Sequence, residues 1–315
     1  MYKNKILSIV IPCYKEELLL GKVLEGLPSY VDHIIIIDDK SPDNTYEVAL
    51  NHASYDKRIV VIKHEQNKGV GGAISTGYKK ALELDSDVAV VMAGDAQMDP
   101  EELPIIIDPV VEEGYDYSKG DRLSSGKAWE MIPKVRYLGN SALSLFTKIA
   151  SGYWHVKDSQ SGYTAINRKA LETIDWDKTY KRYGQPNDLL VRLNIHNFRV
   201  KDVPIRPIYN IGEQSGIKPL RIIPKLSWLL FRLFWYRMLQ KYVIRDFHPL
   251  VFFYFMAFIL IPIGGFFGIY LILFRIFIGT IATTSALFAS FLLIMGFQFL
   301  FFAMWFDMES NKELK

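Results

Sequence analysis

The amino-terminal part of the chain alternates short apolar runs with segments in which apolar residues recur at helical spacing. The short runs are rich in isoleucine and valine and predict four β-strands, at residues 6–11, 34–37, 59–62 and 88–92. The segments between them predict three helices, at residues 16–27, 45–53 and 71–84. Continuous apolar strands separated by helices are typical of a parallel sheet that is covered on both faces. The pattern therefore predicts an α/β domain up to about residue 210.

The carboxyl-terminal part has a different pattern, because charged residues almost vanish from residue 250 onward. Segments 250–274 and 284–306 contain no charged residue, and only Arg275 interrupts the apolar run between them. Each segment exceeds the roughly 20 residues that a helix needs to cross a hydrocarbon core of ~30 Å. The pattern predicts two transmembrane helices with a turn near Arg275, the alternative being one long buried hairpin in a soluble core.

Residues 218–247, just before the first span, combine aromatic and apolar side chains with basic residues at near-helical intervals. This composition predicts amphipathic helices in the membrane interface, and an ordinary surface helix is the alternative. The basic residues in front of the span are Lys218, Arg221, Lys225, Arg232, Arg237, Lys241 and Arg245. Positive charge beside a span favours the cytoplasmic side, and the amino terminus shows no export signal.

These patterns predict an integral membrane protein whose α/β domain and carboxyl terminus are both cytoplasmic. The expected order is an α/β domain at 1–217, interfacial helices at 218–247, a transmembrane hairpin at 248–308 and a tail at 309–315. Cys13 is the only cysteine, which excludes an internal disulfide and a cysteine-rich metal site. The net charge of +3 is small and does not suggest a nucleic-acid partner.

Polar residues that can carry chemistry follow three of the predicted strands. The segment 12–17 follows the first strand, Asp38 and Asp39 close the second, and Asp95 and Gln97 follow the fourth. Ligands of parallel α/β sheets bind beyond the carboxyl ends of the strands. A carboxylate after the second strand can accept hydrogen bonds from a base or a ribose. Two oxygen ligands after the fourth can hold one hard divalent ion together with a diphosphate.

A glycine-rich segment, residues 69–72, stands at the start of the third predicted helix. Glycine lets the backbone approach another group closely, and the free amides at a helix start favour anions. The spacing matches neither the dinucleotide-binding nor the P-loop pattern, so the expected ligand stays unspecified. Residues 99–102, Asp-Pro-Glu-Glu, are interpreted as an ordinary helix start.

Together these segments resemble the inverting family 2 glycosyltransferases, which have the GT-A fold. The likeness is strongest to the group of dolichol-phosphate mannose synthases and undecaprenyl-phosphate sugar transferases, and it covers roughly residues 6–218. The resemblance implies that the nucleotide sugar is bound by Pro12, Tyr14, Glu16, Asp39 and Asp95.

Asp95 matches the second acid of the family's Asp-x-Asp metal motif, and Ala93 stands where the first acid is expected. The resemblance therefore implies that Asp95 and Gln97 bind a Mg²⁺ or Mn²⁺ ion. The two residues are catalytic because they hold this ion. With fewer carboxylates, we expect a lower metal affinity or a larger contribution from the diphosphate.

Residues after position 119 resemble the acceptor side of the same group. Gly120-Asp121-Arg122 is similar to its Gly-Ser-Arg, and Trp129 and Arg136 look like its next tryptophan and arginine. Arg122 and Arg136 are thereby implied to bind the acceptor phosphate, since guanidinium pairs with phosphate oxygens; surface salt bridges are the alternative. Ser215 and Lys218 resemble a serine and lysine that close over the phosphates, although Lys218 lies two positions late.

Asp188 matches an acid that often serves family 2 enzymes as the general base for a hydroxyl acceptor. A phosphate acceptor is already an anion at neutral pH and needs no base. With a hydroxyl acceptor, Asp188 is expected to act as the base. With a phosphate acceptor, it is expected only to orient groups in the site. The alternative is that Asp188 caps its helix.

The implied activity is inverting transfer of a sugar from a UDP- or GDP-sugar to dolichyl or undecaprenyl phosphate at the cytoplasmic membrane face. One alternative is transfer to a hydroxyl acceptor, on a glycolipid or a polysaccharide, with Asp188 as the base. A second alternative, which only Ala93 favours, is a catalytically silent membrane scaffold that binds nucleotides. The sequence leaves open the sugar, the nucleotide, the isoprenoid and the oligomeric state.

Overall fold

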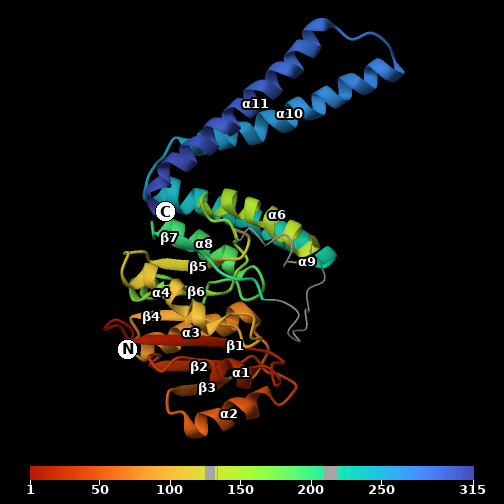
Figure 1. The fold of residues 1–315 in the computed structure, drawn as a ribbon. Helices are drawn as coiled ribbons and strands as arrows, with labels where there is room; N and C mark the ends of the chain where they lie inside the picture. Colours follow the sequence, from red (N-terminus) through yellow and green to blue (C-terminus); the bar gives the residue numbers. More distant parts are fainter. Residues whose placement is uncertain (125–131, 133, 209–218) are drawn as a thin grey trace. The chain divides into compact units, whose positions relative to one another are not determined.

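The computed structural model describes residues 1–124, 132, 134–208 and 219–315 (Figure 1). Side chains at positions 135, 136 and 219–222 are outside this description as well. The chain forms two compact units, one of Met1–Trp235 with Leu314–Lys315 and one of Tyr236–Glu313.

The first unit is built on a seven-stranded sheet with the strand order β3-β2-β1-β4-β6-β5-β7 (Figure 1). Its strands are β1 (Leu7–Cys13), β2 (His33–Asp38), β3 (Ile59–Lys63), β4 (Val88–Val91), β5 (Tyr117–Asp121), β6 (Thr164–Asn167) and β7 (Val200–Pro204). Only β6, among these strands, runs antiparallel to its neighbours β4 and β5. The sheet is therefore mostly parallel, as predicted, and the carboxyl ends of the other strands meet at one end of it.

Helices cover both faces of this sheet, and consecutive strand residues alternate between two cores. The helices are α1 (Leu20–Glu25), α2 (Thr45–Tyr55), α3 (Val70–Glu83), α4 (Leu103–Val111), α7 (Arg168–Thr173) and α8 (Gln185–Ile195). Ile34 and Ile36 pack with α1, α2 and α4. Ile35 and Ile37 pack on the opposite face with α3, α7 and α8. Burial on both faces thus explains the run of four isoleucines in β2.

The seven predicted elements are all present, with shifted ends. The largest shift is in the helix predicted at 16–27, which is confined to α1 because residues 17–19 form a turn. The sequence pattern does not predict β5, because Tyr-Ser-Lys-Gly-Asp has no apolar run although all five residues are buried. Asp99 accepts a hydrogen bond from the Glu101 N–H at 2.9 Å and caps the short 3₁₀ helix η1 (Pro100–Glu102), which confirms the predicted helix start.

A third core in the first unit joins α8 to α6 (Lys134–Ser151) and to the start of α9 (Pro219–Leu239). Its buried members are Val191, Ile195, Leu226, Leu229 and Leu233. Other apolar side chains of α6 and α9 remain exposed, among them Phe146 at 57 % and Trp228 at 62 %. The helix predicted within 218–247 is therefore amphipathic, with one face packed on the domain, while its interfacial location stays a prediction.

The second unit contains the two long apolar helices, α10 (Leu250–Phe277) and α11 (Thr283–Ser310). The π-helix η2 (Gln240–Arg245) precedes them, and a 3₁₀ turn, η3 (Lys312–Leu314), follows. The most apolar windows of α10 and α11 have mean hydropathies of 2.4 and 2.2, and only 17 % and 22 % of these windows is buried. By length and composition both helices can cross a membrane, and their exposure argues against a buried hairpin in a soluble core.

Candidate active site

The carboxyl ends of β1, β2, β4 and β5 bring the predicted site segments to one end of the sheet. Gly94 marks a close approach, since a Cβ there would lie 2.9 Å from Cys13 Sγ and 3.4 Å from Glu16 Cγ. Non-glycine residues with a left-handed backbone follow three of these strands, namely Lys15 (φ 65°), Lys40 (φ 59°) and Ala96 (φ 57°). Such conformations cost roughly 1–3 kcal/mol each and collect at ligand sites. Lys3, Asn4, Asp85 and Asn197, outside these segments, share this conformation, so it is not specific to the predicted site.

The segment after β1 is tied to the segment after β2. The Lys15 N–H donates to Ser41 Oγ at 3.1 Å. The Glu16 N–H donates to Thr45 Oγ1 at 2.8 Å. The Tyr14 side chain stays 46 % exposed and is available to a ligand. This anchored loop carries two of the predicted nucleoside-binding residues, Tyr14 and Glu16, and the third, Pro12, lies at the end of β1.

Asp39 is buried, and both of its carboxylate oxygens already bind groups of the protein. Oδ1 accepts hydrogen bonds from the Lys68 N–H at 2.8 Å and from His64 Nδ1 at 2.7 Å. Oδ2 accepts the Gly69 N–H at 2.7 Å. The anion expected at the start of α3 is therefore the carboxylate of Asp39 itself. Contact between Asp39 and a nucleoside stays a prediction, and it requires lone pairs that these bonds leave unused.

The glycine-rich segment packs against the backbone that precedes α8. A Cβ at Gly71 would lie 2.4 Å from the Tyr180 carbonyl oxygen, and one at Gly69 would lie 2.6 Å from that of Lys181. The Gly72 N–H donates to the same Lys181 oxygen at 3.0 Å. The close approach predicted for these glycines is thus an approach to the protein's own chain, because only glycine fits there.

Asp38 is a candidate that the family resemblance did not single out. It is fully buried, and its Oδ1 accepts the Ser41 N–H at 3.1 Å. Its Oδ2 has no hydrogen-bond partner within the described part of the chain. Since buried carboxylate oxygens are normally paired, this atom is suited to a donor group from a ligand. Only the adjacent acids at the end of β2 signalled this in the sequence.

Asp95 and Gln97 lie in a turn just after β4. Asp95 Oδ1 accepts the Gln97 N–H at 3.0 Å. The Gln97 Nε2 atom is buried and lacks a hydrogen-bond partner among the described residues. Because the two ends of an amide are assigned from their partners, its oxygen can occupy the same place and serve as a hard ligand. The described residues contain no cluster of three or more His, Cys, Asp or Glu suited to a metal, and a metal on Asp95 and Gln97 stays a prediction.

Burial, together with the charges of Asp95 and Asp43, raises the pKa of the Glu16 carboxyl to about 7. The folded pKa therefore lies above that of the unfolded chain, and ionisation of Glu16 opposes folding as the pH rises through this range. We expect Glu16→Gln to have a higher melting temperature than the wild type at about pH 8, with a difference that shrinks toward about pH 5. Thermal unfolding across this range measures it, and a pH-independent difference would contradict the prediction.

Arg122, the predicted acceptor residue after β5, is held by a buried carboxylate. Its Nε and Nη2 donate to the two oxygens of Asp158 at 2.7 and 3.2 Å, and Asp158 is fully buried. Lys119 Nζ donates to the main-chain oxygen of the same aspartate. The ion pair is partly buried rather than at the surface, and binding of a phosphate by Arg122 stays a prediction.

The other predicted acceptor residues fall mostly outside the described part of the chain. These are Ser215 and Lys218, and Trp129 of the same resemblance also lies there, while Arg136 lies in α6 and its side chain is not described.

Asp188 lies in the first turn of α8, and its side chain is buried. Its Oδ2 accepts the Tyr180 N–H at 2.9 Å and Nε of Arg192 at 2.8 Å. These bonds hold the segment that packs on the glycine-rich turn and do not cap the helix, whose N-cap is Gly184. A role of Asp188 as a base stays a prediction.

A model of the family described as glycosyl transferase family 2 matches residues 8–175. This match covers more than half of the chain and includes the segments after β1, β2, β4 and β5. The chain belongs to glycosyltransferase family 2. The α/β fold class and the glycosyltransferase activity that the motifs implied are thereby confirmed.

Curated relatives of this family 2 glycosyltransferase include enzymes that are named for lipid phosphates. A UDP-N-acetylglucosamine–dolichyl-phosphate N-acetylglucosaminyltransferase of Methanococcus voltae is 35 % identical, over 65 % of this chain and 87 % of its own. An undecaprenyl-phosphate mannosyltransferase of Micrococcus luteus is 31 % identical, over 70 % of this chain and 92 % of its own.

Among solved structures, glucosyl-3-phosphoglycerate synthase from Mycobacterium tuberculosis, in complex with Mn²⁺ and UDP, is similar in fold. The TM-score is 0.53 at 20 % identity, over 74 % of this chain and 80 % of the other. This likeness concerns the fold of the catalytic domain.

Proposed function

We propose that this family 2 glycosyltransferase transfers a sugar from a nucleotide sugar to the phosphate of a polyprenyl phosphate. The observation that carries the proposal is the convergence of the segments after β1, β2, β4 and β5 at one end of the sheet. The relatives named for dolichyl and undecaprenyl phosphate support it, because they align over 65 % and 70 % of this chain.

On the donor side, Pro12, Tyr14, Glu16 and Asp39 would bind the nucleoside, and Asp38 adds an unfilled acceptor atom. Asp95 and Gln97 would hold Mg²⁺ or Mn²⁺ together with the diphosphate. The buried, unpartnered amide of Gln97 supports this assignment, as does the Mn²⁺ of the structural neighbour. Such an ion would neutralise the charge of the departing diphosphate.

On the acceptor side, Arg122, Arg136, Ser215 and Lys218 would position the lipid phosphate. One of its oxygens forms a bond to the anomeric carbon while the bond from that carbon to the nucleoside diphosphate breaks, which inverts the configuration. Alignment and charge stabilisation carry the reaction, and no base is needed. The two hydrogen bonds that Asp188 already accepts favour a phosphate acceptor over a hydroxyl acceptor.

The membrane segments fit an acceptor whose isoprenoid tail stays in the bilayer. The helices α10 and α11 are long and apolar enough to span it. The basic residues before α10 support a cytoplasmic catalytic domain, and two crossings would return the tail at 309–315 to the same side.

The test is a transfer assay with purified full-length protein in detergent. A panel of UDP- and GDP-sugars is offered with a polyprenyl phosphate, with and without chelator, and lipid products are identified by mass spectrometry. A chelator-sensitive sugar–phosphate lipid is the expected result. Donor binding and hydrolysis without lipid product would indicate a hydroxyl acceptor, and donor binding without hydrolysis or transfer would indicate the nucleotide-binding scaffold.

A further inference from the structure

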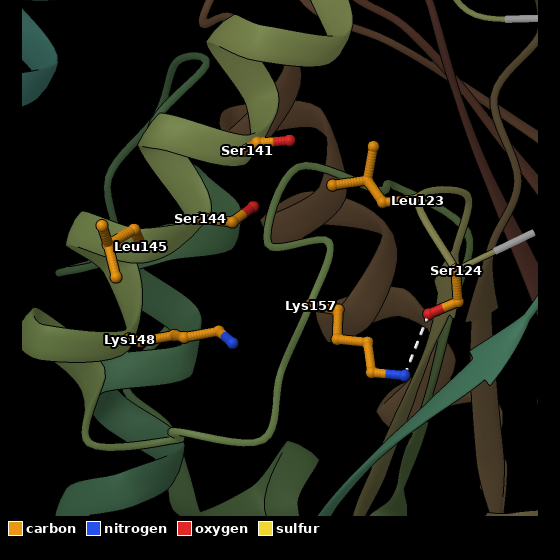
Figure 2. A pocket seen from close by; sticks show the side chains of 7 residues that line it. All are labelled: Leu123, Ser124, Ser141, Ser144, Leu145, Lys148 and Lys157. Atoms are coloured by element: carbon orange, nitrogen blue, oxygen red, sulfur yellow. Dashed lines mark hydrogen bonds between the residues drawn. The ribbon is translucent and has the colours of Figure 1, made fainter. Parts of the chain in front are cut away.

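A pocket of ≈ 240 Å³ lies between α6 and the end of β5 (Figure 2). Its lining combines two lysines, three serines and two leucines. Leu123 and Ser124 come from the residues that directly follow Arg122, and Lys148 comes from α6. Lys157 comes from the loop after α6 (Figure 2). The pocket thus adjoins the predicted acceptor side of the site.

Lys157 reaches carboxylates only indirectly: its side chain contacts Ser124, whose hydroxyl donates to Asp121, and its main-chain N–H donates to Asp202 at 2.5 Å. Lys157 Nζ donates to Ser124 Oγ at 3.1 Å, drawn as the dashed line in Figure 2. No ion pair within the described ranges involves Lys148 or Lys157. Lys148 is half-buried and Lys157 is exposed, so the pocket stays open to a ligand. Unpaired ammonium groups on a partly enclosed wall favour an anion.

The serine hydroxyls of the pocket already have hydrogen-bond partners, so the lysines are the groups that can donate hydrogen bonds to a ligand. Ser141 Oγ donates to the Tyr137 carbonyl oxygen at 2.8 Å. Ser144 Oγ accepts the Ser159 N–H at 3.0 Å, and Ser124 Oγ donates to Asp121. Each hydroxyl therefore already has a partner, whereas an ammonium group has three donors.

The neighbouring cations differ from the lysines of the pocket. Asp158 compensates the charge of Arg122 through two hydrogen bonds, and Lys119 is fully buried. Unlike these two cations, Lys148 and Lys157 are accessible and form no direct ion pair within the described ranges.

The sheet topology sets how far this charge lies from the donor side. β4 and β5 point the same way and are separated by β6 alone. With strands about 4.8 Å apart, their ends lie roughly 10 Å from each other. The end of β5, which Leu123 and Ser124 follow, is thus a short distance from the end of β4.

We propose that Lys148 and Lys157 bind the phosphate of the lipid acceptor in this pocket, with Leu123 and Leu145 beside the first isoprene unit. This inference rests on the proposed function and adds two residues outside the arginine pattern. An ammonium on each wall suits a phosphate monoester, and the leucines suit the apolar group attached to it.

The test measures acceptor and donor KM in neutral detergent with farnesyl phosphate as a short acceptor. The double variant Lys148→Gln/Lys157→Gln should raise the KM for farnesyl phosphate by about tenfold or more, the effect of losing one hydrogen bond to a charged group. The donor KM and the melting temperature should stay at the wild-type values. Lys22→Gln/Lys57→Gln, on two exposed lysines outside the site, is the matched control and should leave the acceptor KM at the wild-type value.

Further measurements distinguish binding of the acceptor phosphate from binding of inorganic phosphate or of phospholipid headgroups. Inorganic phosphate should compete with farnesyl phosphate in the wild type and less in the glutamine variant. An unchanged acceptor KM would overturn the proposal, as would a variant effect that appears only when anionic phospholipid is added. If the wild type makes no lipid product, the proposed function fails. In that case, the affinity for farnesyl phosphate is measured by calorimetry. Equal affinities of the wild type and the glutamine variant would overturn the proposal that the pocket binds the acceptor phosphate.

Discussion

Asp95→Asn is expected to lower sugar transfer by at least about a hundredfold, the loss typical when one charge-stabilising group is removed from a transition state. Asp95 is the acid in the turn after β4, and Ala93 supplies no second carboxylate two residues earlier. The amide of an asparagine keeps the shape of the side chain but removes the negative charge that a divalent ion requires. The measurement is the initial rate at saturating donor across a Mn²⁺ titration.

The matched control is Asp99→Asn, four residues further along the chain. Its side chain accepts the Glu101 N–H and caps η1, a role that asparagine fills equally well, so Asp99→Asn should leave both stability and the metal titration close to wild type. If Asp95→Asn retained both the wild-type rate and its metal dependence, Asp95 would not be the metal ligand.

Asp307→Ala is expected to destabilise the second unit by about 3–5 kcal/mol, the cost of leaving a buried charge without its partner. Arg237 and Asp307 are both fully buried. Arg237 Nη1 and Nη2 donate to the two carboxylate oxygens at 2.7 and 2.8 Å, and the Tyr242 hydroxyl donates to the same carboxylate at 2.9 Å. Removal of the carboxylate leaves the buried guanidinium of Arg237 without its charge partner. Thermal unfolding in detergent measures the effect.

An exposed pair of the same unit provides the control. Glu309 and Lys312 form an ion pair three residues apart, with both side chains more than half exposed. Glu309→Gln should therefore cost at most about 1 kcal/mol. Replacing both buried partners, as in Arg237→Met/Asp307→Leu, should recover much of the stability that the single variant loses. A single variant as stable as the wild type would show that the buried pair does not support this unit.

The sequence by itself determined the elements whose pattern is local. The isoleucines of β2 predicted a strand buried on both faces, and the uncharged stretches within α10 and α11 predicted helices of spanning length. The placement of Asp95 and Gln97 after a strand also followed from the sequence, because parallel strands end together. Such features depend on residues close in the chain, where periodicity and length carry the information.

The tertiary structure decided which partners the polar residues have. Asp39 binds Gly69 some 30 residues away, and Arg122 pairs with Asp158 at a separation of 36. The antiparallel insertion of β6, the burial of β5 and the meeting of Ser124 with Lys157 at one pocket are likewise non-local. No local pattern encodes these choices, because each depends on which distant segments the packed sheet brings together.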